Sequence, residues 1–132
     1  MPAVLGAPAY DTVNHIVYLP DKSSASLGIW RYSLPSGGLV NTATQINIAS
    51  TAGLGGQRPG ALSFDTVDGN LYATMAGNNN IKRIHTPAGA SQVVDSMATT
   101  SNGQPAGGLA VVGAQLWVAE TDGILLIPDP VG

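Results

Sequence analysis

Few residues of this chain are suited to acid–base or metal chemistry. It has two histidines, His15 and His85, one glutamate, Glu120, and no cysteine. The lack of cysteine excludes disulfides, thiolate metal sites and cysteine nucleophiles. No nucleophile elbow, zinc-protease helix motif, phosphate loop or nucleotide fingerprint occurs. The two histidines fall at different positions of the pattern described below, so they need not meet. The sequence therefore predicts no catalytic residue, no metal site and no cofactor, and favours a protein that is not an enzyme.

Acidic residues flank two short turns. Asp65 and Asp68 precede Asn70, and Asp11 and Asn14 form the same pair earlier in the chain. Oxygen ligands at this spacing could hold calcium, but the alternating acidic run of an EF-hand loop is missing. Because the pair recurs, we expect the side chains to cap turns.

Three polar residues are candidates for contacts with a ligand. Asn78 and Asn79 belong to a polar loop that could hydrogen-bond a sugar or a peptide, although a hairpin connection is the simpler interpretation. Glu120 follows an expected strand and lies beside another acid, Asp122. For Glu120 too, a turn with its usual acidic residues is the simpler interpretation.

Aromatic residues provide the fourth candidate, Trp30. Trp30 aligns with Lys82, a position that can be exposed, so we expect Trp30 at the surface. Tyr72 and Trp117 align with each other, and we expect both to pack between structural repeats.

Composition limits the partners. The 132 residues carry a net charge of −3, and only 10% are charged, against about 25% in a typical domain. The five basic residues are scattered, so we expect no nucleic-acid partner. No apolar run approaches the roughly 18 residues of a membrane helix, so we expect no membrane insertion. The first residues lack the features of a signal peptide, yet scarce Lys and Glu with abundant Ser, Thr and Asn favour an extracellular or periplasmic location.

One segment occurs three times in the chain. Residues 8–14 align with 62–68. Further pairings link 16–18 with 70–72 and 115–117, and 28–32 with 80–84 and 123–127. The period, about 45 to 54 residues, is typical of repeat architectures.

Each copy contains short strand signals bounded by Gly, Asn, Asp or Pro, and helical periodicity is nearly absent. Asp68-Gly69 is typical of a tight hairpin. The expected strands are 9–10, 15–19, 28–33 and 44–49 in the first copy, 60–65, 70–75, 81–85 and 92–95 in the second, and 107–112, 115–120 and 123–127 in the third.

Four-stranded antiparallel meanders at this spacing are typical of β-propeller blades. Segments 58–65, 68–74 and 80–84 resemble a blade of the NHL-type propellers, a pattern shared with virginiamycin B lyase-like and gluconolactonase-like propellers. The resemblance implies a fold more than a function, because these families include enzymes, scaffolds and binding domains. Gluconolactonase-like propellers bind a divalent ion through Glu, Asn and Asp, but their early Glu-Gly-Pro signature is missing here, so that site is not assigned to Glu120. An immunoglobulin-like sandwich is the alternative, and the internal repeat argues against it.

We therefore predict an all-β fold, a single β-propeller segment of about three four-stranded antiparallel blades. Blade one covers about residues 6–57, blade two about 58–104 and the partial third blade about 105–132. Residues 1–5 are predicted to form a strand that completes the last blade, unless a partner chain completes it.

Three blades are too few to close a ring, because propellers close with about four to eight. An isolated arc would expose apolar faces and unpaired strand edges. We predict a non-catalytic binding or structural module that assembles with itself, for example as a six-bladed homodimer, or with other subunits of a larger complex. The alternatives are a lactonase- or lyase-like enzyme with a channel site assembled between chains, and a sugar-binding lectin-type propeller.

Overall fold

The structure is a computed structural model that describes residues 6–21, 28–33, 44–49, 54, 58–76, 80–85, 87–89, 92–98, 105–113, 115–120 and 123–128. Within these ranges the chain is all-β, as predicted, and every regular element is a strand. None of the described residues form a helix long and apolar enough to cross a membrane.

The strands form three antiparallel sheets, each of which is a meander in chain order. Sheet 1 contains β1 (Ala9–Asp11), β2 (Ile16–Asp21), β3 (Gly28–Ser33) and β4 (Thr44–Ala49). Sheet 2 contains β5 (Arg58–Phe64), β6 (Leu71–Ala76), β7 (Asn80–His85) and β8 (Val93–Ala98). Sheet 3 contains β9 (Pro105–Val112), β10 (Gln115–Glu120) and β11 (Gly123–Pro128). The predicted strand numbers of four, four and three are confirmed for the described residues, and none of these sheets closes on itself.

Buried aspartates fix the first hairpin of sheets 1 and 2. Asp11 Oδ1 accepts hydrogen bonds from the backbone N–H groups of Val13 and Asn14, at 2.9 and 3.0 Å. Asp65 Oδ1 accepts one from Val67 N–H at 2.8 Å. The turn-capping interpretation is confirmed at both sites, because each carboxylate satisfies backbone donors of its own turn.

The same two turns need a left-handed residue just before the next strand. Gly69 has φ of 71° there, and His15 has φ of 55°. Glycine adopts this conformation readily, whereas a histidine rarely does. The turn geometry of sheet 1 therefore comes with backbone strain at His15.

Sheet 2 lies between the other two and is buried on both faces. The core shared with sheet 1 contains Tyr18 and Phe64, whose rings stack with centroids 5.7 Å apart. Its buried members are Ala9, Ile16, Tyr18, Ile29, Leu54, Leu62, Leu71, Ala73, Met75 and Ile84. The core shared with sheet 3 is built on Tyr72, Ile81, Leu116 and Val118. Side chains that alternate along β6 thus supply both cores, as the two-residue period of a strand requires.

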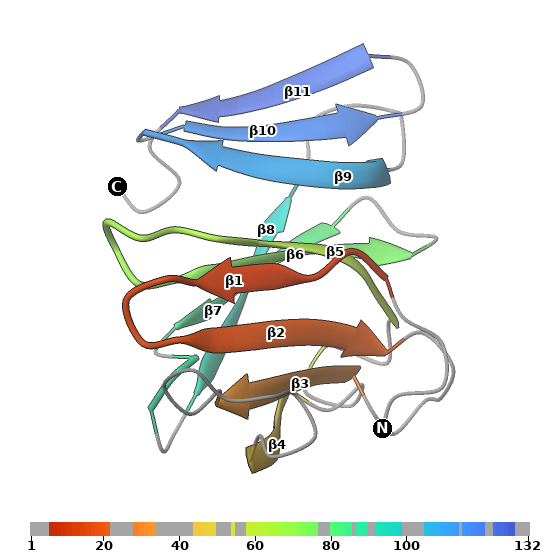
Figure 1. The fold of residues 1–132 in the computed structure, drawn as a ribbon. Helices are drawn as coiled ribbons and strands as arrows, with labels where there is room; N and C mark the ends of the chain where they lie inside the picture. The colour runs from red at the N-terminus through yellow and green to blue at the C-terminus, as the bar shows by residue number, and fades with distance from the viewer. Residues whose placement is uncertain are drawn as a thin grey trace.

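The first strands of the three sheets lie side by side. β5 contacts both β1 and β9, and the last strands, β4, β8 and β11, each form the edge of their sheet opposite to the first strand; Figure 1 shows β11 at the top and β4 at the bottom of the view. Residues 1–5, the predicted closing strand, lie outside the described residues. The segment that follows pairs with β5, since Ala7 N–H donates to Gly60 O at 3.2 Å and Leu62 N–H donates to Ala7 O at 3.0 Å.

A buried arginine links sheet 1 to the loop that follows β7. The Arg31 side chain is 8% exposed, and its Nη1 donates to the carbonyl oxygens of Pro87 and Gly89, both at 2.8 Å. Hydrogen bonds from a charged donor to buried carbonyls are stronger than neutral ones. Arg31 therefore fastens the outer part of sheet 1 to sheet 2.

Replacing Arg31 with methionine should lower the free energy of unfolding by about 2 kcal/mol, because the buried Pro87 carbonyl loses its charged donor, while Gly89 O keeps the hydrogen bond from Gln92 Nε2. Chemical denaturation followed by circular dichroism measures the change. Arg58→Met is the matched control, since Arg58 is exposed at the start of β5, and it should change stability by less than about 0.5 kcal/mol. Equal effects of the two substitutions would contradict this role for Arg31.

Buried tyrosines should make the fold sensitive to alkali. Burial, with a smaller effect of the Asp11 carboxylate, raises the pKa of Tyr18 far above its ordinary value of 10.0, and burial also raises the pKa of Tyr32 and Tyr72. The unfolded chain then loses these protons first, so stability is complete below about pH 10 and falls as the pH rises further. Urea unfolding at a series of pH values should show this fall, and Tyr18→Phe should make it shallower. An unchanged slope in Tyr18→Phe would contradict the assignment.

Candidate functional site

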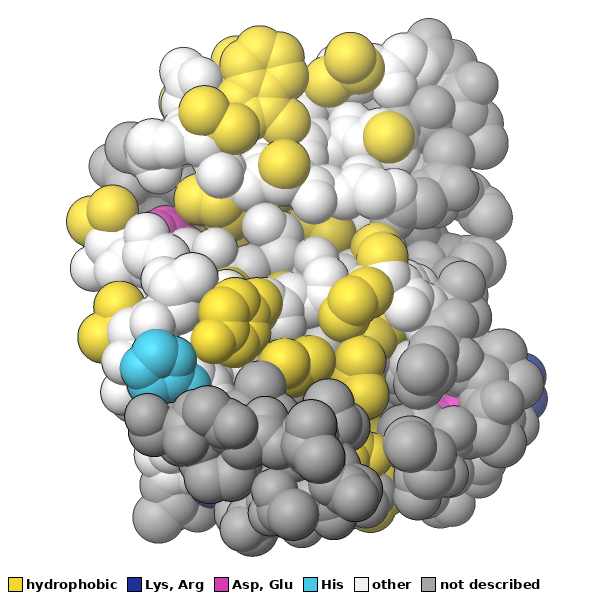
Figure 2. Space-filling view, viewed as in Figure 1, with side chains coloured by type: hydrophobic (Ala, Val, Ile, Leu, Met, Phe, Trp, Pro, Cys, Tyr) yellow, Lys and Arg dark blue, Asp and Glu magenta, His cyan; other side chains and the backbone are white. Residues whose placement is uncertain are grey.

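The side of sheet 3 that faces away from sheet 2 is apolar and open to solvent. On this side Trp117, Ile124 and Leu126 are 39%, 71% and 40% exposed. We define the open face by these three residues together with Gly108, Ala110 and Ala119, all of which are exposed. The face encloses a shallow hollow of about 340 Å³ whose floor includes Leu109 and Val118. Figure 2 shows hydrophobic side chains gathered over sheet 3, at the top of the molecule.

The exposure of Trp117 is unusual among residues in its register. Tyr18 pairs with Arg31, Tyr72 pairs with Arg83, and Trp117 pairs with Leu126, in each case across the second and third strands of a sheet. Tyr18 and Tyr72 are 0% exposed. The expectation that aromatic residues here pack between sheets is thus confirmed for Tyr72, whereas Trp117 stands on the open face.

The isoleucine at the start of each third strand shows the same contrast. Ile29, Ile81 and Ile124 occupy one register, opposite Pro20, Thr74 and Ala119. Ile29 and Ile81 are 0% exposed because sheets 2 and 3 cover them, but Ile124 is 71% exposed. Among the described residues, nothing covers this register on sheet 3.

Sheet 1 also has a side that no sheet of the described residues covers, the one that faces away from sheet 2. Tyr32 pairs with Val17 on this side and is nevertheless only 5% exposed. Tyr10, on this side, is 45% exposed and pairs with Val17, as Phe64 pairs with Leu71 in sheet 2. Leu19 and Trp30 lie on the same side of the sheet and are partly exposed. We define the first-sheet face by Tyr10, Val17, Leu19 and Trp30.

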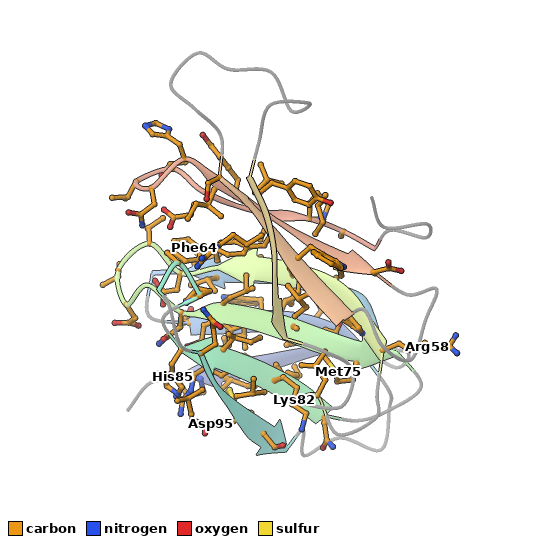
Figure 3. All side chains as sticks on the ribbon, turned by 90° about the horizontal axis from the view of Figure 1, so that it is seen from below. Arg58, Phe64, Met75, Lys82, His85 and Asp95 are labelled. Carbon is orange, nitrogen blue, oxygen red and sulfur yellow. The ribbon has the colours of Figure 1, made fainter. Side chains whose placement is uncertain are left out.

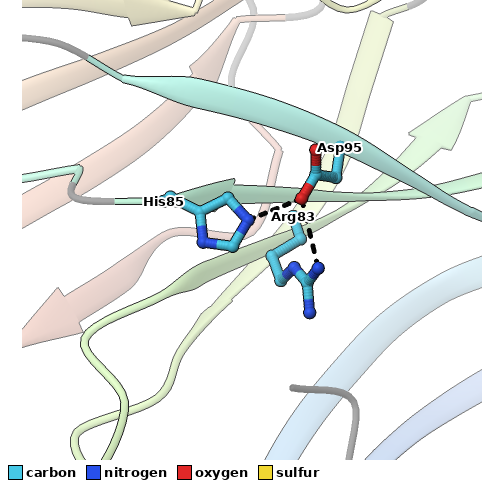
Figure 4. A network of polar contacts seen from close by, with 3 residues as sticks. All are labelled: Arg83, His85 and Asp95. Carbon is cyan, nitrogen blue, oxygen red and sulfur yellow. Dashed lines mark hydrogen bonds and ion pairs between the residues drawn. The ribbon is translucent and has the colours of Figure 1, made fainter. Parts of the chain in front are cut away.

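A cluster of polar side chains lies on β7 and β8. His85 Nε2 is 2.6 Å from Asp95 Oδ2, and Arg83 Nη2 donates to the same oxygen at 3.1 Å (Figure 4). The hydrogen bond with His85, and then that with Arg83, lowers the pKa of Asp95 below its ordinary value of 3.8. A carboxylate can orient an imidazole for acid–base work, but the groups that contact Asp95 include no nucleophile. Exposed pairs of this kind contribute little to stability.

Lys82, which sequence reasoning placed at an exposed position, is only 8% exposed. Its Nζ hydrogen-bonds with Ser96 Oγ, directly across from it on β8. Figure 3 shows Lys82 further along the sheet than His85 and Asp95. Its position explains the correction, because one side of β7 lies against sheet 1 and the lysine stem is covered there.

The four residues predicted as ligand contacts do not form one site in the described chain. Trp30 belongs to the first-sheet face, and its indole N–H has no hydrogen-bond partner among the described residues. Asn78 and Asn79 lie outside the described residues. Glu120 ends β10, where it pairs with Gly123. Within the described residues, no group of three or more potential metal-ligating side chains comes together.

Sequence reasoning missed Ile124 and Leu126, the most distinctive part of the open face. The signal lay in the alignment, which matched Ile124 to two isoleucines that are buried. No protein-family model matches the chain, and no curated protein matches it.

The polar cluster should lower the pKa of the Asp95 carboxyl group. Nuclear magnetic resonance titration should place the pKa of its carboxyl group below 3.8, so that the stability it contributes is present above that pH and lost at lower pH. His85→Gln should raise this pKa more than Arg83→Met, because the histidine hydrogen bond has the larger effect. An ordinary pKa of Asp95 in the unaltered protein would show that the cluster does not form.

Proposed function

We propose that this protein is a non-catalytic binding and structural module, a β-propeller segment that acts by assembling through the open face of sheet 3. The observation that supports the proposal most is the contrast in one register, where Ile29 and Ile81 are 0% exposed and Ile124 is 71% exposed. The open face has the side chains of a sheet-to-sheet interface. On sheets 1 and 2, the side chains at the corresponding positions pack against the next sheet.

The arrangement of the sheets supports a propeller. Three meanders in sequence, with neighbouring first strands and with each last strand at the opposite edge of its sheet, are what blades around an axis would have. The shared registers of Tyr18, Tyr72 and Trp117 agree with a repeat. We propose an extracellular or periplasmic location on composition alone.

Association through the open face is energetically reasonable. Complete burial of an isoleucine, leucine or aromatic side chain is worth about 1.5–3 kcal/mol. Trp117, Ile124 and Leu126 therefore provide several kcal/mol toward the cost of association, and an opposing apolar face would provide as much again. Only 10% of the residues are charged, and leaving an apolar patch of this kind in contact with water is unfavourable.

The described contacts give less support to the alternatives. A lactonase- or lyase-like site needs converging acids, bases or an ion, and the side chains of the open face are apolar. A lectin-type site needs amides beside its aromatic residues, and the small residues around Trp117 supply none. We therefore favour assembly over catalysis or sugar binding.

Ile124→Asp tests the role of the open face. Light scattering should give the unaltered protein a mass that is a multiple of 13.4 kDa, and Ile124→Asp should reduce it to the mass of one chain, because a charge cannot be buried in an apolar interface. Val67→Asp is the matched control, since Val67 is 80% exposed in a turn away from the face, and it should leave the mass unchanged. A single-chain mass for the unaltered protein would contradict self-assembly.

A further inference from the structure

We infer that the open face of sheet 3 receives the first-sheet face of a second copy of this chain, with Trp117 stacked on Tyr10 of that copy. The inference rests on the proposed assembly and names its partner and its contact. The two sheet junctions inside the chain are templates for a third junction between chains.

The junction between sheets 1 and 2 supplies the first template. There Tyr18 of sheet 1 stacks on Phe64 of sheet 2, with 5.7 Å between ring centroids and 24° between ring planes. Offset aromatic pairs at this separation add stability beyond the burial of their surface. Tyr18 lies on β2 and Phe64 ends β5, so a second strand packs on the first strand of the next sheet.

The register shows which residues would form this pair at a third junction. Trp117 has the register of Tyr18 and Tyr72, as shown above. Tyr10 pairs with Val17 as Phe64 pairs with Leu71. A junction that repeats the first one would therefore bring Trp117 onto Tyr10, and these two residues are 39% and 45% exposed.

The junction between sheets 2 and 3 follows the same plan with smaller side chains. Val111 pairs with Leu116, which gives it the register of Phe64, and it packs in the core that contains Tyr72. The backbone N–H of Val111 also donates to Ser63 Oγ at 3.1 Å. Both junctions thus join corresponding positions, although their side chains differ.

The open face and the first-sheet face lie on the same side of the molecule. Figure 2 shows hydrophobic side chains over sheet 3 at the top and over β1 and β2 below, both turned toward the viewer. A second copy related by a two-fold axis could engage both faces at once, because residue i then contacts residue j and residue j contacts residue i. Two copies would give six sheets, within the range of about four to eight blades that closes a propeller.

Complementation between two damaged copies tests the pairing. Tyr10→Asp alters the first-sheet face and removes an exposed hydrogen bond with His15 Nδ1, and Ile124→Asp alters the open face. Both residues are exposed, so the fold should survive. In a pure sample of either variant, both junctions contain one aspartate, and we expect single chains. In a mixture, one junction of the mixed dimer is undamaged and the other carries both aspartates. Because one aspartate is enough to break a junction, the second costs little more, and the dissociation constant of the mixed dimer should be at least roughly tenfold lower than that of either variant alone. Differently tagged copies and sedimentation analysis give the three values.

Each result decides between specific occupants of the open face. A Tyr10→Asp variant that still dimerises would mean that open faces pack on each other, and this would overturn the inference but keep the proposed function. An unaltered protein that stays a single chain would overturn the inference and exclude self-assembly, and would leave another protein or further sheets of a longer chain as the occupant of the face. Val13→Asp, 70% exposed in the turn after β1, is the matched control for Tyr10→Asp and should dimerise normally.

Ala110→Ser provides a second test, because this substitution should make the dimer tighter. Ala110 pairs with Trp117 as Ser63 pairs with Tyr72, so a serine there would place its hydroxyl in the register of Ser63. Tyr10 of the second copy would offer its N–H as Val111 does, so the two-fold dimer gains one hydrogen bond at each of its two junctions and should tighten by roughly tenfold or more. Unchanged or weaker dimerisation would contradict this register for the contact.

Discussion

Packing of apolar sheets face to face is the constraint on which the rest of this structure depends. Alternate side chains of a strand point to opposite faces, and sheet 2 is apolar on both. Leu71 and Ala73 face sheet 1, and Tyr72 and Ile81 face sheet 3, all at 0% exposure. A sheet of this kind is stable only with a neighbour on each side. Sheets 1 and 3 have the same two-sided character, but each has only one neighbour in the described chain.

Polar groups hold these sheets in position but do not drive their packing. Asp11 and Asp65 satisfy the backbone of their own turns, and Arg31 ties sheet 1 to carbonyl groups beyond β7. The ion pairs of Asp95 are partly exposed and so contribute little to stability. With so few charges, the chain depends on burial for cohesion, and it lacks the charged surface that keeps many small domains apart.

Local sequence signals were enough to predict the strands and turns. The Asp-Gly pair at 68–69 and short β-branched runs predicted the meanders, and recurrence of the turn acids predicted capping. The contacts of Arg31 with Pro87 and Gly89 were not predictable, because no local pattern links residues more than 50 positions apart. The exposure of Trp117 was missed for a related reason. Burial of Trp117 would require a neighbouring sheet. The residue type shows only that an apolar neighbour would fit there, and does not show that one is present.

Close approach of the first strands determines how the sheets are arranged, and so how they can continue. A Cβ atom at Gly6 would lie 1.8 Å from the carbonyl oxygen of Gly60, so only glycine allows the chain to run this near β5. The first strands of the three sheets lie close together, and each last strand is at the opposite edge of its sheet, so the sheets are arranged around the line of first strands. A contact that repeats this arrangement closes into a ring, whereas one that does not would continue into a filament. The close approach of Gly6 to Gly60 therefore helps to fix how sheet 1 lies on sheet 2, and the proposed assembly would take its cohesion from the apolar faces.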